Sequence, residues 1–118
     1  MPKQTKFNRS PCPLAVTLDI MGDKWSLIVI RDLFRGLKRY TDFLASPEGV
    51  TTNILAERLK RLEEHGLISK TAYQNNPVRY EYELTNKGRA LGPVLREIAH
   101  WGNAFYPGTF KPAFTSNK

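Results

Sequence analysis

Five side chains between residues 51 and 60 have the types and the spacing needed to read the edges of nucleic-acid bases. An asparagine can form two hydrogen bonds with an adenine, a contact that contributes about 1–3 kcal/mol of discrimination. Small side chains beside it let a helix backbone approach the base edges in the major groove of double-stranded DNA. The residues that we predict for these contacts are Thr51, Thr52, Asn53, Ala56 and Lys60.

These side chains need a helix to carry them, and the surrounding sequence predicts one. Leu55, Leu59 and Leu62 recur at i, i+4 and i+7, so they form one stripe that must be buried. Either threonine before the stripe can accept a hydrogen bond as the N-cap, so a purely structural role for one of them is an open alternative. Gly66 can adopt the left-handed conformation that ends a helix.

The segments before this helix complete a helix-turn-helix. Residues 13–21 predict a short apolar helix with a proline at its first position, where a missing amide costs little. Residues 24–36 predict a central core helix, with Asp23 as its N-cap and Gly36 as its end. A short helix over 40–45 and a connection over 47–50 then lead into the amphipathic helix.

The residues that follow predict a wing and a last helix. Residues 67–73 and 78–84 are typical of strands, and a turn over 74–77 joins them into a hairpin. Thr85 can cap a final helix that runs to about residue 105, and Pro93 inside it should bend it. The fold class predicted is therefore α+β, mainly helical: a winged helix-turn-helix. Residues 1–11 are expected to form a flexible basic arm, 12–106 the domain and 107–118 an irregular tail.

Composition restricts the classes of function. Eighteen Lys and Arg against eleven Asp and Glu give a formal charge of +7, which favours a polyanionic partner. No apolar run approaches the ~20 residues of a membrane span, so we expect a cytoplasmic protein without membrane contact. One cysteine excludes a disulfide within the chain, and one Cys with two His are too few for an ordinary zinc site. No catalytic constellation appears, so we expect neither enzyme nor cofactor.

A second group of polar residues is positioned to hold a nucleic-acid backbone. These residues precede the first helix of the motif, flank the leucine stripe or lie near the tip of the hairpin. They are Lys38, Arg39, Arg58, Arg61, Asn75, Asn76 and Arg79. For Arg58 and Arg61, an ion pair with Glu57 or Glu64 is an equal alternative. For the hairpin tip, the alternative is simple solvation.

Cys12 is a candidate redox-sensing residue. Its thiol lies at or just before the start of a helix, where the dipole and the free amides favour the reactive thiolate, and Arg9 would act in the same direction. The thiol could form a disulfide with its twin in a dimer or react with a small thiol or electrophile. The alternative is an inert, partly buried cysteine that packs as a small hydrophobe.

Six short segments together resemble the HxlR family of bacterial winged helix-turn-helix regulators, relatives of the MarR group. The resemblance covers Cys12 to about Tyr106. The segments are Cys12-Pro13, Gly22-Asp23-Lys24-Trp25, Arg39-Tyr40-Thr41-Asp42-Phe43-Leu44, Leu59-Lys60-Arg61-Leu62-Glu63-Glu64-His65-Gly66-Leu67-Ile68, Arg79-Tyr80-Glu81-Tyr82-Glu83-Leu84-Thr85-Asn86-Lys87-Gly88 and Trp101-Gly102.

The resemblance implies a homodimer assembled through the first and last helices, with two wings and two recognition helices on a pseudo-palindromic operator. Members of the family are repressors or activators, and several sense oxidants or electrophiles through a cysteine at the position of Cys12. The residues expected at the dimer interface are Leu14, Leu18, Leu91, Leu95, Ile98, Trp101 and Phe105.

We therefore expect a dimeric, DNA-binding transcription regulator, more specifically a repressor. Within this class, the alternative is a regulator whose small-molecule effector binds between the core and the dimer helices, with Cys12 incidental. Outside it, a winged helix can serve as a protein-docking or RNA-binding module.

Overall fold

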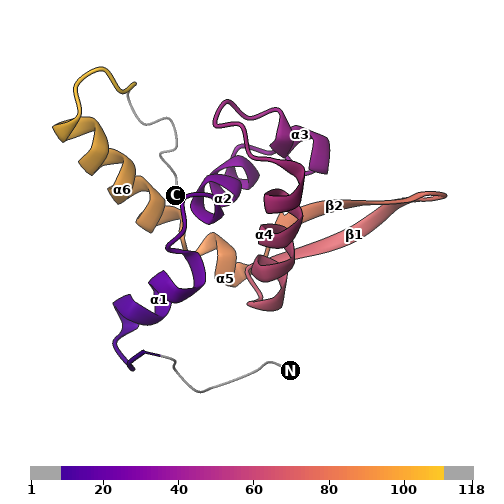
Figure 1. The fold of residues 1–118 in the computed structure, drawn as a ribbon, viewed down its shortest axis with the longest axis horizontal. Coiled ribbons are helices and arrows are strands. Elements are labelled where there is room, and N and C mark those ends of the chain that lie inside the picture. The colour runs from indigo at the N-terminus through magenta and orange to yellow at the C-terminus, as the bar shows by residue number, and fades with distance from the viewer. Residues whose placement is uncertain (1–8, 111–118) are drawn as a thin grey trace.

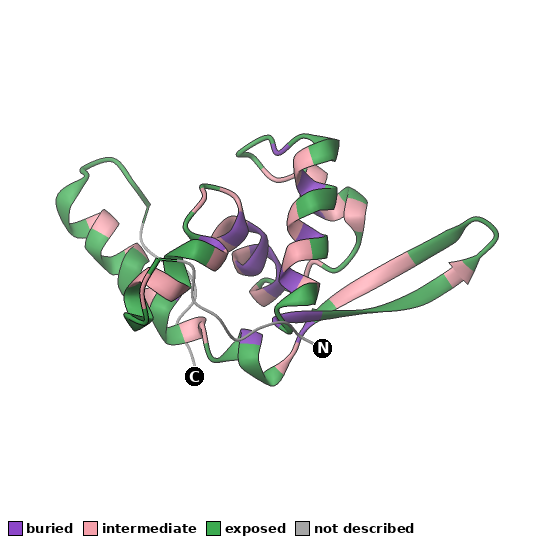
Figure 2. Ribbon diagram, turned by 60° about the horizontal axis from the view of Figure 1, so that its bottom comes forward, coloured by how far each residue is buried: buried purple, intermediate pink, exposed green. Residues whose placement is uncertain are grey.

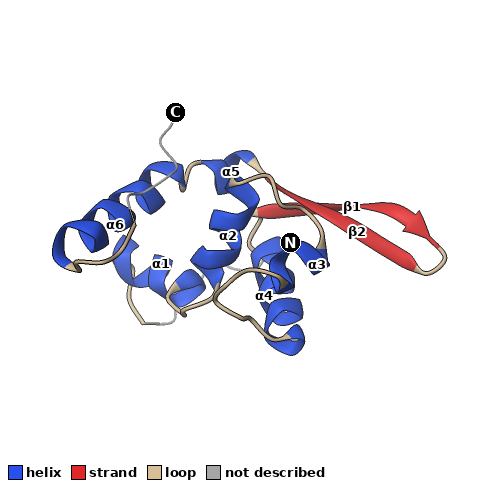
Figure 3. Cartoon of the chain, turned by 90° about the horizontal axis from the view of Figure 1, so that it is seen from above, coloured by secondary structure: helices blue, strands red, loops and turns tan. Residues whose placement is uncertain are grey.

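The computed structural model describes residues 9–110, which form a helical body with a long projecting hairpin (Figure 1). α1 and α6 lie on the side of the body away from the hairpin, and α3 and α4 lie beside the base of the hairpin (Figures 1 and 3). The elements in chain order are α1 (Pro13–Met21), α2 (Ser26–Phe34), α3 (Tyr40–Leu44), α4 (Thr52–Glu64), β1 (Ile68–Asn75), β2 (Val78–Leu84), α5 (Asn86–Arg89) and α6 (Gly92–Phe105). This order is that of a winged helix, as predicted.

The two predicted glycine ends are confirmed. Gly36 and Gly66 have φ values of 92° and 75°, a conformation that costs a residue with a Cβ about 1–2 kcal/mol. Beyond α4, the amide of Leu67 donates to the carbonyl of Leu62 at 2.9 Å, and the Gly66 amide donates to Glu63 at 3.0 Å. This pair of bonds is the Schellman motif, which turns the chain from the helix directly into β1.

The core lies where α2, α3 and α4 meet the base of the hairpin (Figure 2, purple). The predicted leucine stripe is confirmed, because Leu55, Leu59 and Leu62 are 0%, 3% and 0% exposed. Ile30 from α2 and Phe43 from α3 are buried in the same cluster. Burial of the stripe fixes which face of α4 points outward.

The wing is the antiparallel pair of β1 and β2, with Ile68 opposite Leu84 at its base. β1 is longer than predicted, and a bulge between Ala72 and Gln74 shifts its register. The Asn76-Pro77 peptide bond at the tip is cis. At the base, Lys38 accepts a backbone hydrogen bond of 2.8 Å from the Tyr82 amide, so the segment before α3 pairs with β2 and joins the wing to the helix-turn-helix.

The single bent helix that we predicted after Thr85 is wrong. The chain forms two helices, α5 and α6, and Pro93 lies in the first turn of α6. A proline is tolerated there because the first amides of a helix have no partner within the helix, whereas an interior proline removes a bond and clashes. Thr85 does cap α5, since its hydroxyl accepts a hydrogen bond of 3.1 Å from the Gly88 amide.

The predicted arm and tail lie largely outside the described residues. Of the arm, residues 9–11 are described, and Arg9 forms an ion pair of 2.7 Å with Asp19 on α1. Of the tail, residues 107–110 are described, and the Asn103 amide of α6 donates to Thr109 and Phe110. In the described part of the chain, no helix is both long enough and apolar enough to cross a membrane.

Candidate nucleic-acid interface

The outer face of α4 carries the residues predicted for base contact. Thr51, Thr52, Asn53, Ala56 and Lys60 are all exposed, and the structure brings them together on the helix side opposite the leucine stripe. Within residues 9–110, no side-chain hydrogen bond or ion pair engages the two threonines, Asn53 or Lys60. Their polar groups are therefore available to a partner.

The threonine capping bond that we considered is absent from the described chain. Thr51 has the extended N-cap backbone, but its hydroxyl accepts no capping hydrogen bond. The start of α4 is held differently, because the Tyr40 hydroxyl of α3 donates to the Thr52 carbonyl at 2.8 Å. This contact links the two helices of the helix-turn-helix at the surface that carries Asn53.

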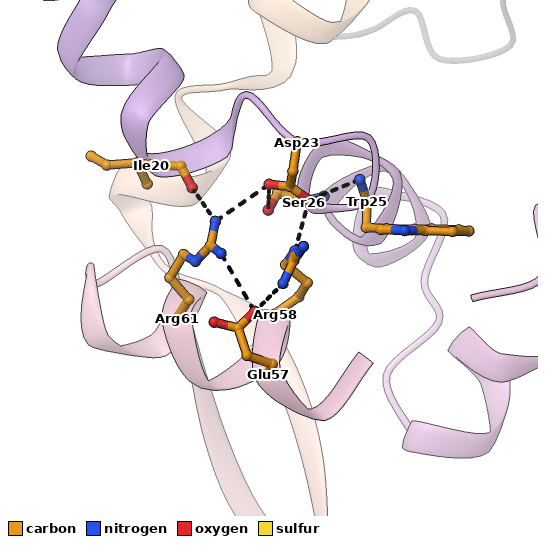
Figure 4. Close-up of polar contacts among 7 residues, drawn as sticks. All are labelled: Ile20, Asp23, Trp25, Ser26, Glu57, Arg58 and Arg61. Atoms are coloured by element: carbon orange, nitrogen blue, oxygen red, sulfur yellow. Dashed lines mark hydrogen bonds and ion pairs between the residues drawn. The ribbon is translucent and has the colours of Figure 1, made fainter. Parts of the chain in front are cut away.

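Arg58 and Arg61 lie on the inner flank of α4. Both form ion pairs within the chain, which was the alternative to contact with a nucleic-acid backbone. The Arg58 Nε donates to the Asp23 carboxylate at 2.7 Å, and Arg58 also pairs with Glu57 (Figure 4). Arg61 contacts Asp23 at 3.4 Å and donates to the Ile20 carbonyl at 3.2 Å. Glu57 was anticipated as a partner, whereas Asp23 was predicted only as the N-cap of a helix over 24–36. That cap position is corrected, because α2 begins at Ser26 and Trp25 is its N-cap.

We call Asp23, Ser26, Arg58 and Arg61 the Asp23 cluster, because the Asp23 carboxylate contacts each of the other three side chains. This carboxylate also accepts from the backbone amides of Trp25 and Ser26 at 2.9 and 3.0 Å and from the Ser26 hydroxyl at 2.6 Å (Figure 4). Burial alone would raise the pKa of the Asp23 carboxyl, but the hydrogen bonds from Ser26, Arg58 and Trp25 hold it well below its usual range. Asp23 therefore carries its negative charge at neutral pH.

A second carboxylate cluster, which was not predicted from the sequence, fixes the turn between α3 and α4. Asp32 on α2 is 1% exposed and accepts from Arg31 and from the Ser46 hydroxyl. Arg31 makes two further hydrogen bonds, of 2.7 and 2.9 Å, with Glu48 in the turn. These bonds raise the pKa of Arg31 and lower that of Glu48. An aspartate beside an arginine in a largely apolar helix is the signal that could have revealed the cluster, because a buried charge requires partners.

Arg39 is held by the wing. Its guanidinium pairs with Glu81 of β2 at 2.8 Å and lies 3.8 Å from the centre of the Tyr73 ring. The hydrogen bond with Glu81 raises the pKa of Arg39. We therefore assign Arg39 to the junction of helix-turn-helix and wing. Its neighbour Lys38 is exposed, and its ammonium has no ion-pair partner within residues 9–110.

The tip of the wing presents uncommitted polar side chains. Asn75, Asn76 and Arg79 are exposed, and in the described chain none of the three forms a side-chain hydrogen bond or ion pair. The turn itself is braced by the Gln74 amide, which donates to the Pro77 carbonyl at 3.1 Å. Arg79, which lies opposite Gln74 next to the turn, is thus available to a partner.

Cys12 is exposed at the N-cap of α1, and its carbonyl accepts the first helical hydrogen bond from Val16 at 2.9 Å. The thiol is therefore not buried within the single chain, and its reactivity stays a prediction. The support expected from Arg9 is also weaker than predicted, because Asp19 already pairs with that guanidinium.

The residues predicted for the dimer interface separate into two groups. Leu14, Leu18, Ile98, Trp101 and Phe105 are 50–67% exposed, an unusual state for large apolar side chains. Leu95, by contrast, is 6% exposed and is corrected to a core residue of the single chain, whereas Leu91 is partly buried against that core and stays a candidate for the interface. Tyr106, 58% exposed, contacts the Trp101 ring and extends the apolar face of α6.

A surface cavity of about 330 Å³ lies between α2, β2 and α5, lined by residues that include Leu33, Lys38, Tyr82 and Arg89. It is not the space between the core and the dimer helices that the alternative, a small-molecule-responsive regulator, would use. In the described residues, no group of three or more His, Cys, Asp or Glu could hold a metal ion.

Comparison with known proteins identifies the family. Residues 20–109 match the model of the HxlR-like helix-turn-helix family. An uncharacterized HTH-type transcriptional regulator of Synechocystis, sll1512, is 42% identical over 84 residues, which are 71% of this chain and 62% of that protein. The chain thus spans less than two thirds of this relative's length.

Two solved structures are similar in both sequence and fold. The redox regulator HypR, in its oxidized form, is 33% identical, with a TM-score of 0.71 over 79% of this chain and 96% of that chain. The reduced form of the transcriptional regulator YodB from Bacillus subtilis is 29% identical, with a TM-score of 0.68 over 86% of this chain and all of that chain. The chain therefore belongs to the HxlR-like helix-turn-helix family of transcriptional regulators.

Proposed function

We propose that this protein binds double-stranded DNA sequence-specifically, as a homodimer on a pseudo-palindromic operator, and represses transcription there. The observation that carries the proposal is the uncovered outer face of α4, whose small and polar residues are exposed while the opposite face is buried. An exposed helix start of this kind can enter a major groove, and the wing beside it can hold the backbone. The net charge of +7 supports a polyanionic partner.

Base reading is assigned to Thr51, Thr52, Asn53, Ala56 and Lys60, and Asn53 provides the sharpest test. Footprinting on promoter fragments first identifies an operator, and fluorescence anisotropy then measures affinity for operator and for random DNA. Asn53→Ala should reduce the ratio of the two affinities by about 5- to 150-fold, the loss of one bidentate contact. Asn86→Ala removes the same amide from an exposed helix start outside α4 and the wing, and should leave the ratio unchanged. Equal ratios for both variants would reject the assignment.

Backbone contact is assigned to Lys38, Arg79 and the two asparagines of the wing tip. Arg79→Gln should weaken binding to all sequences alike and reduce the slope of log affinity against log salt by about 1. Arg89→Gln, which removes the same charge from α5, is the control. A slope for Arg79→Gln equal to that of the control would place Arg79 off the DNA.

The homodimer is supported by the exposed apolar residues of α1 and α6, since a lone chain rarely leaves such a surface uncovered. Sedimentation equilibrium should give twice the chain mass. A stable monomer that still bound an operator would overturn the dimer and keep the DNA-binding proposal. Repression is tested by placing the footprinted operator before a reporter gene, whose expression should rise when the regulator is deleted.

A response to oxidants or electrophiles through Cys12 is the second candidate function. It is supported by the exposed thiol at a helix N-cap and by the similarity to HypR and YodB, the former named a redox regulator. Mild diamide treatment should produce a linked dimer or a modified thiol, detected by mass spectrometry, and should alter operator affinity in the wild type but not in Cys12→Ser. A wild type that stays unmodified with unaltered affinity would reject sensing and leave an effector-responsive regulator with Cys12 incidental.

A further inference from the structure

The orientation of α4 depends on more than its buried leucines. Apolar burial is non-directional, so Leu55, Leu59 and Leu62 determine which face of α4 points inward but allow the helix to roll or slide. Charge-assisted hydrogen bonds are directional and constrain the angle between the groups that they join. On the inner flank of α4, these bonds come from Arg58 and Arg61.

Both arginines converge on one carboxylate that belongs to the connection between α1 and α2 (Figure 4). Arg58 and Asp23 are 35 positions apart in the sequence, and their side chains are only 18% and 20% exposed. The Arg61 guanidinium spans the Asp23 carboxylate and the Ile20 carbonyl in α1. α4 is therefore attached to the C-terminal end of α1 through a group that also receives the start of α2.

Both oxygens of the Asp23 carboxylate are fully used as hydrogen-bond acceptors. One oxygen accepts from the Ser26 hydroxyl and from Arg61, and the other accepts from two backbone amides and from Arg58. An asparagine has nearly the same shape but replaces one acceptor by two donors. Whichever way its amide turned, at least one of these donors would face an N–H group instead of an acceptor.

We propose that Asp23 is a positioning residue: by joining Arg58 and Arg61 to the end of α1, it sets the orientation in which α4 meets the operator, and so determines sequence discrimination. The inference rests on the proposed function, because it presumes that α4 reads DNA. It adds a residue that lies off the reading face and acts through the two arginines.

The test compares two variants that remove the same charge from neighbouring positions. Asp23→Asn removes the carboxylate of the Asp23 cluster, whereas Asp19→Asn removes a carboxylate of α1 that pairs with Arg9. Both raise the net charge by one, so a difference between them in discrimination does not come from net charge. The ratio of operator to random affinity should fall by about tenfold in Asp23→Asn and stay at the wild-type value in Asp19→Asn.

Two further variants separate orientation from folding. Asp23→Ser keeps a hydroxyl that can accept from the Trp25 and Ser26 amides but removes the carboxylate that pairs with the arginines. Arg58 keeps its pair with Glu57 and Arg61 keeps the Ile20 carbonyl, so this variant should still fold and should lose discrimination. Asp23→Glu restores a carboxylate and should recover part of the ratio. If Asp23→Asn does not fold, Asp23→Ser carries the comparison.

The outcomes distinguish the two proposals. A wild-type protein that cannot tell operator from random DNA defeats the proposed function. A discriminating wild type whose Asp23→Asn or folded Asp23→Ser variant discriminates equally well overturns this inference alone. NMR without DNA can measure how fast the Arg58 Nε proton exchanges with solvent. Exchange should be slow in the wild type and fast in Asp23→Ser, because Asp23 accepts the hydrogen bond of this proton. Fast exchange in the wild type would show that the bond between Arg58 and Asp23 does not persist and would overturn the inference.

Discussion

Gly88 offers the clearest quantitative test of how the wing is attached. It is buried in α5, where a Cβ would lie 2.1 Å from the carbonyl oxygen of Leu67 and 3.0 Å from a methyl carbon of Leu84. The first of these is a backbone atom at the start of the wing, so no side-chain rotation can relieve the contact. Gly88→Ala must therefore push α5 away from the base of β1.

The size of the effect follows from the distance. Reaching the 3.4 Å of an ordinary contact needs a displacement of 1.3 Å. That movement would strain the bonds that dock α5, among them the Thr85 amide on the Leu67 carbonyl at 3.1 Å and the Thr85 hydroxyl on the Gly66 carbonyl at 2.6 Å. Overpacking plus about two lost hydrogen bonds predicts a loss of about 3 kcal/mol in the free energy of unfolding.

Thermal unfolding followed by far-UV circular dichroism measures this loss, at one fixed chain concentration because self-association raises apparent stability. The midpoint should fall by about 10–20 °C for Gly88→Ala. Gly92→Ala is the matched control, since its Cβ would make only an ordinary contact of 3.4 Å with the Phe34 ring. Midpoints for the two variants within about 2 °C of each other would refute the reasoning.

Three further perturbations test other parts of the molecule. Gly66→Ala should cost about 1 kcal/mol in urea denaturation because φ is 75° there, and an unchanged midpoint would argue against the left-handed turn. The hydrogen bond from Arg31 lowers the pKa of Glu48, so its stabilisation is present above the ordinary glutamate value of 4.5 and lost as the pH falls through the lowered pKa. Stability should therefore decline less steeply in acid for Glu48→Gln than for the wild type, and identical pH profiles would contradict the pair. Trp101→Ser should raise the dissociation constant of the dimer by about tenfold or more in sedimentation, whereas no change would move the dimer contact away from this part of α6.

Local features of the sequence determined the order and the ends of the elements. The leucine stripe of α4, the ends at Gly36 and Gly66 and the cap at Thr85 each depend on residues within about four positions of one another. Hydrophobic period and turn chemistry are therefore sufficient to predict the winged helix. The position of Pro93 in the first turn of α6 could not be predicted in this way. A proline can either interrupt one helix or begin the next, and the local sequence pattern does not distinguish the two.

Only the tertiary structure decided which partner each charged and apolar residue takes. Arg58 pairs with Asp23, 35 positions away in the sequence, and Arg39 pairs with Glu81, 42 positions away. At such separations, the spacing of two residues in the sequence does not tell whether they are close in space. The same holds for Leu95 and Ile98, which share a helix stripe although the first is buried in the core and the second is 51% exposed. A periodic pattern identifies a face of a helix, but the packing of the whole chain determines what covers that face.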